Sequence, residues 1–200
     1  MNTDRLVLFL QQAAAIPLES ETQRLNMFEH SASKEAAVLI GIVAKQSGWH
    51  ILLTRRADNL RHHSGQISFA GGRMDVSDDT PETCALRETY EETGIPAEAW
   101  QTFPALPCLA TPSGYRVHPV PALCRHNPPV FPNPDEVAEI IYLPLDDALD
   151  LARYTSRTAV HRGQTLHTPQ LPYLNHDIWG LTALILKGLA ERLQRWQQAV

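Results

Sequence analysis

GGRMDVSDDTPETCALRETYEETGI, residues 71–95, is the stretch of the sequence that decides the fold. It reads as a glycine-rich, acidic loop that leads into a helix. The Thr80 hydroxyl can cap a free backbone N–H, and proline at the first helical position, Pro81, gives up no hydrogen bond. Gly94 supplies the stop. The pattern therefore predicts a helix over residues 81–93, about 20 Å long.

Three glutamates of this helix share one face, because positions i, i+3 and i+4 are neighbours on a helix. They are Glu88, Glu91 and Glu92. We expect this acidic face to point outward, and Leu86 and Tyr90 to point the other way into a core.

Carboxylates this close repel one another, by about 0.2–0.5 kcal/mol per exposed pair. Arg87, four residues before Glu91, is the one local cation that can offset the repulsion. A divalent cation is the natural further partner, because hard cations such as Mg²⁺ and Mn²⁺ prefer oxygen ligands. The alternative interpretation is a solvated acidic face without a metal.

The same loop and helix resemble the Nudix box. The matching positions, at fixed spacing, are the glycine-rich loop, Arg87-Glu88, Glu91-Glu92 and Gly94-Ile95. The general box has glycine, five residues, glutamate, seven residues and then Arg-Glu. This chain carries one extra residue between Gly72 and Arg87, and Asp78 or Asp79 stands where the first glutamate belongs.

The segment just before the box resembles the second signature of the coenzyme A diphosphatase branch of the Nudix family. Its matching parts are LLTRRA at residues 52–57, Arg61, Gly65 and FAGG at residues 69–72. That branch also tends to carry the longer box with aspartates. Ala70 stands where the branch usually has proline, which changes the stiffness of the loop but removes no reactive group. TPSGY (111–115), EVAEI (136–140) and IWGLTA (178–183) extend the resemblance over most of the chain.

The resemblance implies an α/β fold, namely the Nudix-type α/β/α sandwich with a mixed β-sheet. It also implies a hydrolase that cuts the diphosphate of coenzyme A or its derivatives to 4′-phosphopantetheine and 3′,5′-ADP. The alternatives are a diphosphatase for another nucleoside diphosphate derivative such as ADP-ribose, and a Nudix domain that senses a nucleotide without cleaving it. Loss of box carboxylates is the usual sign of a sensor, and here all three are present.

Diphosphate hydrolysis needs neutralised charge and an activated water, and Mg²⁺ or Mn²⁺ supplies both. Our first choice of metal ligands is Glu88 and Glu92, with Glu91 and the Gly71 carbonyl oxygen beside them. Glu88 is also the candidate base, and a metal-bound hydroxide is the alternative. Arg87 is expected to orient the carboxylates.

Acidic and basic loop residues complete the candidate site. We expect Arg55, Arg56 and Arg61 in a loop at residues 55–65, one strand away from the acidic helix. Guanidinium groups match phosphate oxygens, so Arg56 and Arg61 are the candidate substrate-binding residues. Solvated loop arginines are the alternative. Three aspartates of the box loop are candidates for holding outer-sphere waters or, equally, for turn formation: Asp75, Asp78 and Asp79.

Composition and the first residues of the chain bear on its partners and its location. The net charge of −5 comes with no basic patch, so we expect no nucleic-acid partner. The three cysteines form no CxxC pair, which favours reduced thiols in a cytosol. Residues 1–16 lack a basic segment and the apolar run at 6–10 is short, so we expect a cytoplasmic protein that does not enter a membrane.

The remaining elements follow from hydrophobic periodicity. We expect helices at residues 6–10, capped by Thr3, at 145–151 and at 178–198. We expect strands at residues 36–44 and 49–54, joined as a hairpin by a turn at Ser47-Gly48, and further strands at 66–70, 103–109, 115–123 and 137–143. A second hairpin is expected of 153–160 with 164–173. The apolar side of the last helix fits core packing or a homodimer face. With no linker or repeat, residues 1–200 are expected to form a single domain, with residues 1–30 as a helical extension.

Overall fold

A computed structural model describes residues 1–28, 34–59, 63–161 and 164–199 of the chain. The strands of its main sheet are β1 (Lys34–Lys45), β2 (Gly48–Arg56), β3 (Ile67–Ser68), β4 (Gly71–Arg73), β5 (Gln101–Thr102), β6 (Leu109–Ala110), β7 (Tyr115–Cys124) and β8 (Val137–Pro144). A smaller sheet contains β9 (Thr155–His161), β10 (Gln164–Tyr173) and β11 (His176–Trp179). The helices are α1 (Thr3–Ala13), α2 (Glu19–Phe28), α3 (Pro81–Thr93), α4 (Leu145–Leu149) and α5 (Gly180–Ala199), with short 3-10 turns at Ala97–Ala99 and Leu151–Arg153.

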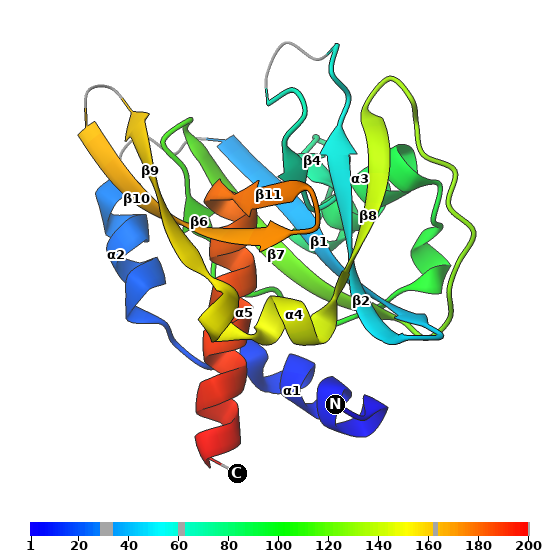
Figure 1. Cartoon of the computed structure of the whole chain (residues 1–200). Coiled ribbons are helices and arrows are strands. Elements are labelled where there is room, and N and C mark those ends of the chain that lie inside the picture. The colour runs from blue at the N-terminus through cyan, green and yellow to red at the C-terminus, as the bar shows by residue number, and fades with distance from the viewer. Residues whose placement is uncertain (29–33, 60–62, 162–163, 200) are drawn as a thin grey trace.

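The main sheet is mixed, as the sequence predicts (Figure 1). Its central path runs β3-β2-β1-β7-β5, and β4, β6 and β8 pair with β1, β7 and β2. β1 and β7 run parallel from Lys34 beside Tyr115 to Val43 beside Cys124. β1 pairs antiparallel with β2, which confirms the predicted hairpin. The predicted pairing of β9 with β10 is also confirmed, whereas its turn at residues 162–163 lies outside the described residues.

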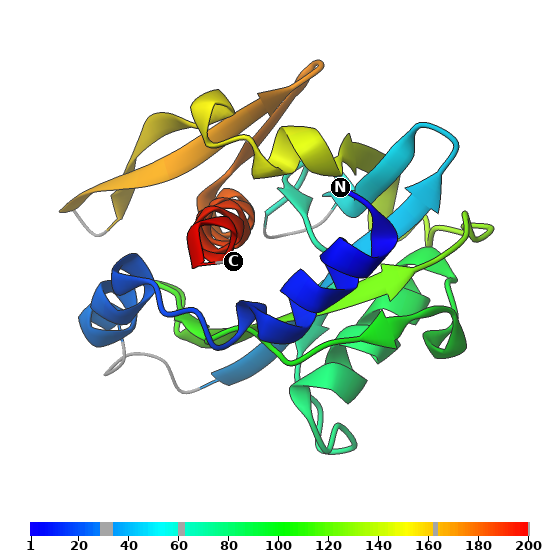
Figure 2. The same ribbon diagram turned by 90° about the horizontal axis from the view of Figure 1, so that it is seen from below.

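Helices cover both faces of the main sheet, and Figure 2 shows α1 and α3 on opposite sides of it. One hydrophobic core lies between the sheet and α1, α4 and α5. A smaller core lies between the sheet and α3. Successive residues of β2 alternate between the two, because side chains of a strand point to opposite faces. Leu53 joins the larger core and Leu52 the smaller one, so Thr54 and Arg56 share the face of Leu52, toward α3.

The predicted strand at residues 103–109 is wrong. Only its last residue, Leu109, is in a strand, and the segment before it has no regular structure. Pro104 and Pro107 have no backbone N–H to donate, and the residues of β7 that accept from the segment, Pro119 and Pro121, have none to return, so the ladder is incomplete. It still follows β7, because the Phe103 and Leu106 N–H groups donate to carbonyl groups of that strand.

Three predicted helix limits also change. The last helix begins at Gly180, because Ile178 pairs with Leu171 in the smaller sheet. The first helix covers Thr3–Ala13, and its cap is Asn2, whose side chain accepts from the Arg5 N–H. The helix predicted at 145–151 stops at Leu149, before a separate 3-10 turn.

The apolar side of α5 is buried within the chain, which is the core interpretation. Ile185, Leu189 and Leu193 all belong to the larger core. Among the described residues, no helix has both the length and the apolar character needed to cross a membrane.

Replacing Gly41 by alanine is expected to destabilise the protein by about 1–3 kcal/mol, because an added methyl overpacks the smaller core. A Cβ at Gly41 would lie 2.8 Å from the Cη2 atom of Trp100, whose indole is almost fully buried. Urea unfolding measures the effect. The control is Gly41→Ala made in a Trp100→Phe background, because the smaller phenylalanine ring lacks the atom that clashes. An equal cost in both backgrounds would contradict this explanation.

Candidate active site

The box helix α3 has both ends fixed by local hydrogen bonds, at the predicted residues. Thr80 accepts from the Thr83 N–H (3.2 Å) and the Thr83 hydroxyl accepts from the Thr80 N–H (3.1 Å), a reciprocal capping box. At the other end Gly94 takes a left-handed conformation, φ 72°, and its N–H donates to the Tyr90 carbonyl. The helix is therefore a rigid platform for the glutamates that it carries.

The predicted division of α3 into an outward acidic face and an inward apolar face is wrong in part. Glu92 is only 3% exposed, because it follows Ala85 and Thr89 on the stripe that packs against the sheet. Glu91 is exposed as expected, whereas Tyr90 is 57% exposed and does not enter a core. The Glu92 carboxylate therefore points into the protein, and the Tyr90 ring points out into solvent.

The carboxylate of Glu92 is held by two donors from different strands. The Thr54 hydroxyl donates to its Oε2 atom (3.2 Å), and the Gly71 N–H donates to its Oε1 atom (3.3 Å). Burial raises the pKa of Glu92 to about 7, against the opposing effects of these two donors and of the Arg56 charge.

Glu88 lies beneath the glycine-rich loop, one helical turn before Glu92. Its carboxylate occupies the space where a side chain on Gly72 would begin, so a residue other than glycine would displace this carboxylate. An Arg87 nitrogen lies 3.0 Å from its Oε1 atom. Burial is the largest cause of a raised pKa at Glu88, and Arg87 opposes it.

Arg87 connects the loop to the helix. It forms a fork with Asp78, Nε to Oδ1 at 3.1 Å and Nη2 to Oδ2 at 2.8 Å, and contacts Glu91 at 3.1 Å. The hydrogen bond from Arg87 lowers the pKa of Asp78 to about 2. Asp78 also accepts from the Asp75 N–H, so these two aspartates take part in the turn.

The three arginines that the sequence analysis placed in one loop differ in their surroundings. Arg55 and Arg56 end strand β2 instead of starting a loop, so the predicted loop begins too early. Arg55 is engaged by Asp58 (2.8 Å) and Glu139 (3.5 Å). Arg56 is close enough to Glu92 to lower the pKa of that carboxyl, and its buried Nε lacks a hydrogen-bond partner among the described residues. Arg61 lies outside the described residues.

Two residues of this site, Thr54 and Glu136, were not predicted from the sequence. Glu136 immediately precedes β8, and its charge raises the pKa of both Glu88 and Glu92. Asn133 donates to it (3.4 Å) and also binds the Glu92 carbonyl through its own N–H. The signal for Glu136 is the pairing of β2 with β8, which becomes visible only in the folded sheet.

The oxygen atoms at this site are ligands of the kind that a hard divalent cation prefers. The described residues contain no group of three metal-ligating side chains that is already arranged to hold a metal ion. Burial is the largest cause of the raised pKa values of Glu88 and Glu92, and repulsion from the Glu136 carboxylate raises both further. A cation with oxygen ligands would relieve that repulsion. Arg87 contacts the Oε1 atom of Glu88, so it can hold the carboxylate while the second oxygen binds a cation.

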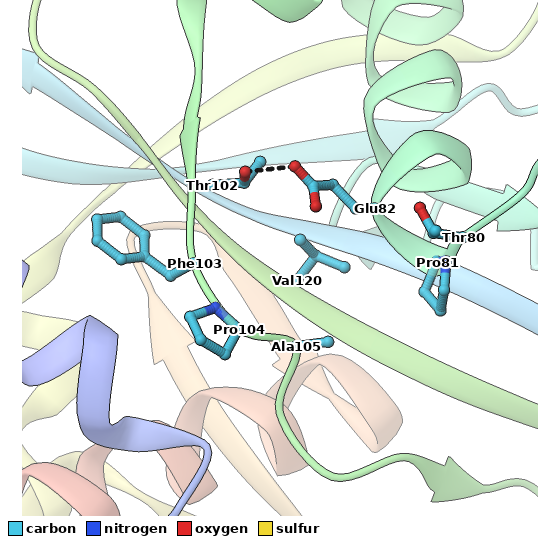
Figure 3. Close-up of a pocket in the computed structure, with 8 residues that line it drawn as sticks. All are labelled: Thr80, Pro81, Glu82, Thr102, Phe103, Pro104, Ala105 and Val120. Atoms are coloured by element: carbon cyan, nitrogen blue, oxygen red, sulfur yellow. Dashed lines mark hydrogen bonds between the residues drawn. The ribbon is translucent and has the colours of Figure 1, made fainter.

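A cavity of about 370 Å³ lies elsewhere, at the N-terminal end of α3. Figure 3 shows Glu82 facing Thr102, whose hydroxyl donates to it, with Phe103 and Pro104 along the wall. Glu88, Glu91 and Glu92 do not line this cavity, so it is separate from the candidate site.

Comparisons with known proteins agree with the box and the fold. The NUDIX domain model matches residues 33–162. The Yersinia pestis protein named "Uncharacterized Nudix hydrolase NudL" is 41% identical over 174 residues, which cover 84% of this chain and 86% of that protein. A Yersinia pseudotuberculosis protein of the same name matches equally.

Solved structures show a similar fold at lower identity. RenU, a Nudix hydrolase from M. smegmatis, has a TM-score of 0.53 and 22% identity, covering 84% of this chain and 87% of that one. A NUDIX hydrolase from Alicyclobacillus acidocaldarius has a TM-score of 0.52 and 19% identity, covering 80% and 92%. The α/β fold with a mixed sheet and flanking helices is therefore confirmed.

Proposed function

The chain belongs to the Nudix hydrolase family, and we propose that it is a diphosphatase that cleaves coenzyme A or a derivative of it to 4′-phosphopantetheine and 3′,5′-ADP. Nudix hydrolases act on small-molecule diphosphates and generally use divalent metal ions. The proposal rests on one observation: residues from two separate sequence signatures lie next to each other in the structure. Thr54 and Arg56, from the coenzyme A signature, lie beside Glu92 of the box.

Metal binding is assigned to the box. Glu88 and Glu92, with Glu91 and the Gly71 carbonyl, would hold Mg²⁺ or Mn²⁺, which neutralises diphosphate charge and activates water when it is bound. Glu88 remains the candidate base. Arg87 would act as a positioning residue, in keeping with its contacts to carboxylates of both loop and helix.

Substrate binding is assigned to basic residues beside the box. The buried Nε–H of Arg56 has no hydrogen-bond partner among the described residues and lies close to a proposed metal ligand, so a phosphate oxygen could accept from it. Arg55 is already engaged by two carboxylates, so it is the weaker candidate. Arg61 stays a proposal from the family signature alone.

We expect purified protein to cut coenzyme A to 4′-phosphopantetheine and 3′,5′-ADP in Mg²⁺ or Mn²⁺, and to lose this activity when EDTA removes the metal. The reason is that a metal ion carries most of the charge stabilisation in diphosphate hydrolysis. Mass spectrometry of the products would follow parallel reactions with coenzyme A, 3′-dephospho-coenzyme A and ADP-ribose.

The substrate panel separates the alternatives. Faster turnover of ADP-ribose would retain the diphosphatase and reject the coenzyme A assignment. Binding of these nucleotides without cleavage, under either metal, would favour a sensor. Activity that survives EDTA would contradict the metal-dependent reaction itself.

A further inference from the structure

We propose that Thr54 is a positioning residue that fixes the carboxylate of Glu92 in one orientation for metal binding. This inference rests on the proposed function, because it assumes that Glu92 is a metal ligand. Thr54 lies outside the box helix, on strand β2.

The contacts of Glu92 show how the carboxylate is held. Thr54 donates to Oε2 and Gly71 to Oε1, so each oxygen has its own donor. The two donors come from β2 and β4, which pair with different parts of the same edge of β1, across from β7. Two hydrogen bonds from separate strands fix both the position of the carboxylate and the rotation of its plane.

Thr54 can act in this way because its own position is tightly constrained. It is 1% exposed, and its strand is paired on one side with Ser68 of β3 and on the other with Ile140 of β8. A β-branched side chain is also stiff about χ1. Its hydroxyl therefore remains on the face of β2 that turns toward α3, where Glu92 lies.

The hydroxyl has a second acceptor within reach, the Ser68 carbonyl oxygen at 3.5 Å. A hydroxyl carries one proton and can satisfy only one of these acceptors at a time. The carboxylate is closer, at 3.2 Å, and hydrogen bonds to an ionised acceptor are the stronger kind. The Glu92 contact is therefore the main one, and Ser68 is a minor partner within the sheet.

Loss of the hydroxyl would affect metal binding more than folding. A buried carboxylate oxygen without its donor is free to turn away from the position that a metal needs. Removal of residues that hydrogen-bond a metal ligand typically lowers metal affinity by about 10–100-fold. Valine matches threonine in shape, so Thr54→Val removes the donor and keeps the packing.

The test measures Mn²⁺ binding by electron paramagnetic resonance without any substrate, and hydrolysis separately. We expect Thr54→Val to weaken Mn²⁺ binding by about 10–100-fold, and Thr54→Ser, which keeps the hydroxyl, to restore most of the affinity. Thr182→Val is the matched control. It also removes a buried hydroxyl, but one that donates to the Ile67 carbonyl. Circular dichroism and thermal melting of the metal-free proteins check that each variant folds.

The outcomes separate this inference from the proposed function. Wild-type protein that binds no Mn²⁺ would overturn both. Wild-type binding together with unchanged affinity in Thr54→Val would overturn only the role of Thr54. Equal weakening in Thr54→Val and Thr182→Val would do the same, because it would reveal a general packing effect. If Thr54→Val fails to fold, Thr54→Ser and Thr54→Ala decide: equal affinity in these two would overturn the inference.

Discussion

Replacing Glu88 by glutamine is expected to lower kcat/KM at least about a hundredfold, as the loss of a catalytic group does. Glutamine keeps the size of the side chain but removes a charge and an anionic oxygen from the proposed metal site. The carboxylate lies directly under Gly72 and beside Arg87, so its replacement alters the point where loop and helix meet. Steady-state hydrolysis of coenzyme A measures the effect.

The same variant should not lose stability without metal. Burial raises the pKa of Glu88, so its ionised form destabilises the folded protein at neutral pH, and a neutral side chain removes that cost. Arg87 keeps Asp78 and Glu91 as partners. Glu82→Gln, on the same helix and away from the site, is the control and should retain activity. Hydrolysis by Glu88→Gln at the wild-type rate would remove Glu88 from the proposed mechanism.

Replacing Glu21 by alanine is expected to destabilise the protein by about 3–5 kcal/mol, because it leaves a buried charge unpaired. Glu21 accepts two hydrogen bonds from Arg192, at 2.7 and 2.5 Å, and Arg192 is completely buried in α5. Arg192 also donates to the Ala13 carbonyl (3.1 Å) and so joins both N-terminal helices to the last helix. The melting temperature should fall by roughly 6–20 °C.

Two further variants test the cause of this loss. Glu19→Ala removes an exposed carboxylate from the same helix and should change stability by less than about 0.5 kcal/mol. Glu21→Leu combined with Arg192→Met should be more stable than Glu21→Ala, because no unpaired charge stays buried. A melting temperature for Glu21→Ala equal to that of Glu19→Ala would contradict the assigned role of the ion pair.

Local sequence signals were sufficient wherever residues close in the chain decide the structure. The limits of α3 follow from Thr80, Pro81 and Gly94, which act within one helical turn. The hairpin of β1 and β2 follows from two apolar runs on either side of a turn. The predicted strand at 103–109 failed because prolines occur both within it and at the positions of β7 that it faces, Pro119 and Pro121, so hydrogen bonds of the ladder are missing from both sides.

The sequence by itself determined the fold class, the family and the positions of the box carboxylates along α3. Only the tertiary structure decided what surrounds each carboxylate: Glu92 is buried between Thr54 and Gly71, Glu91 is exposed, and Glu136 joins them from the start of β8. Helical spacing fixes the direction of each side chain relative to its neighbours on the helix. Burial and charge compensation depend on which strands pack against that helix, and those contacts join residues tens of positions apart in the chain.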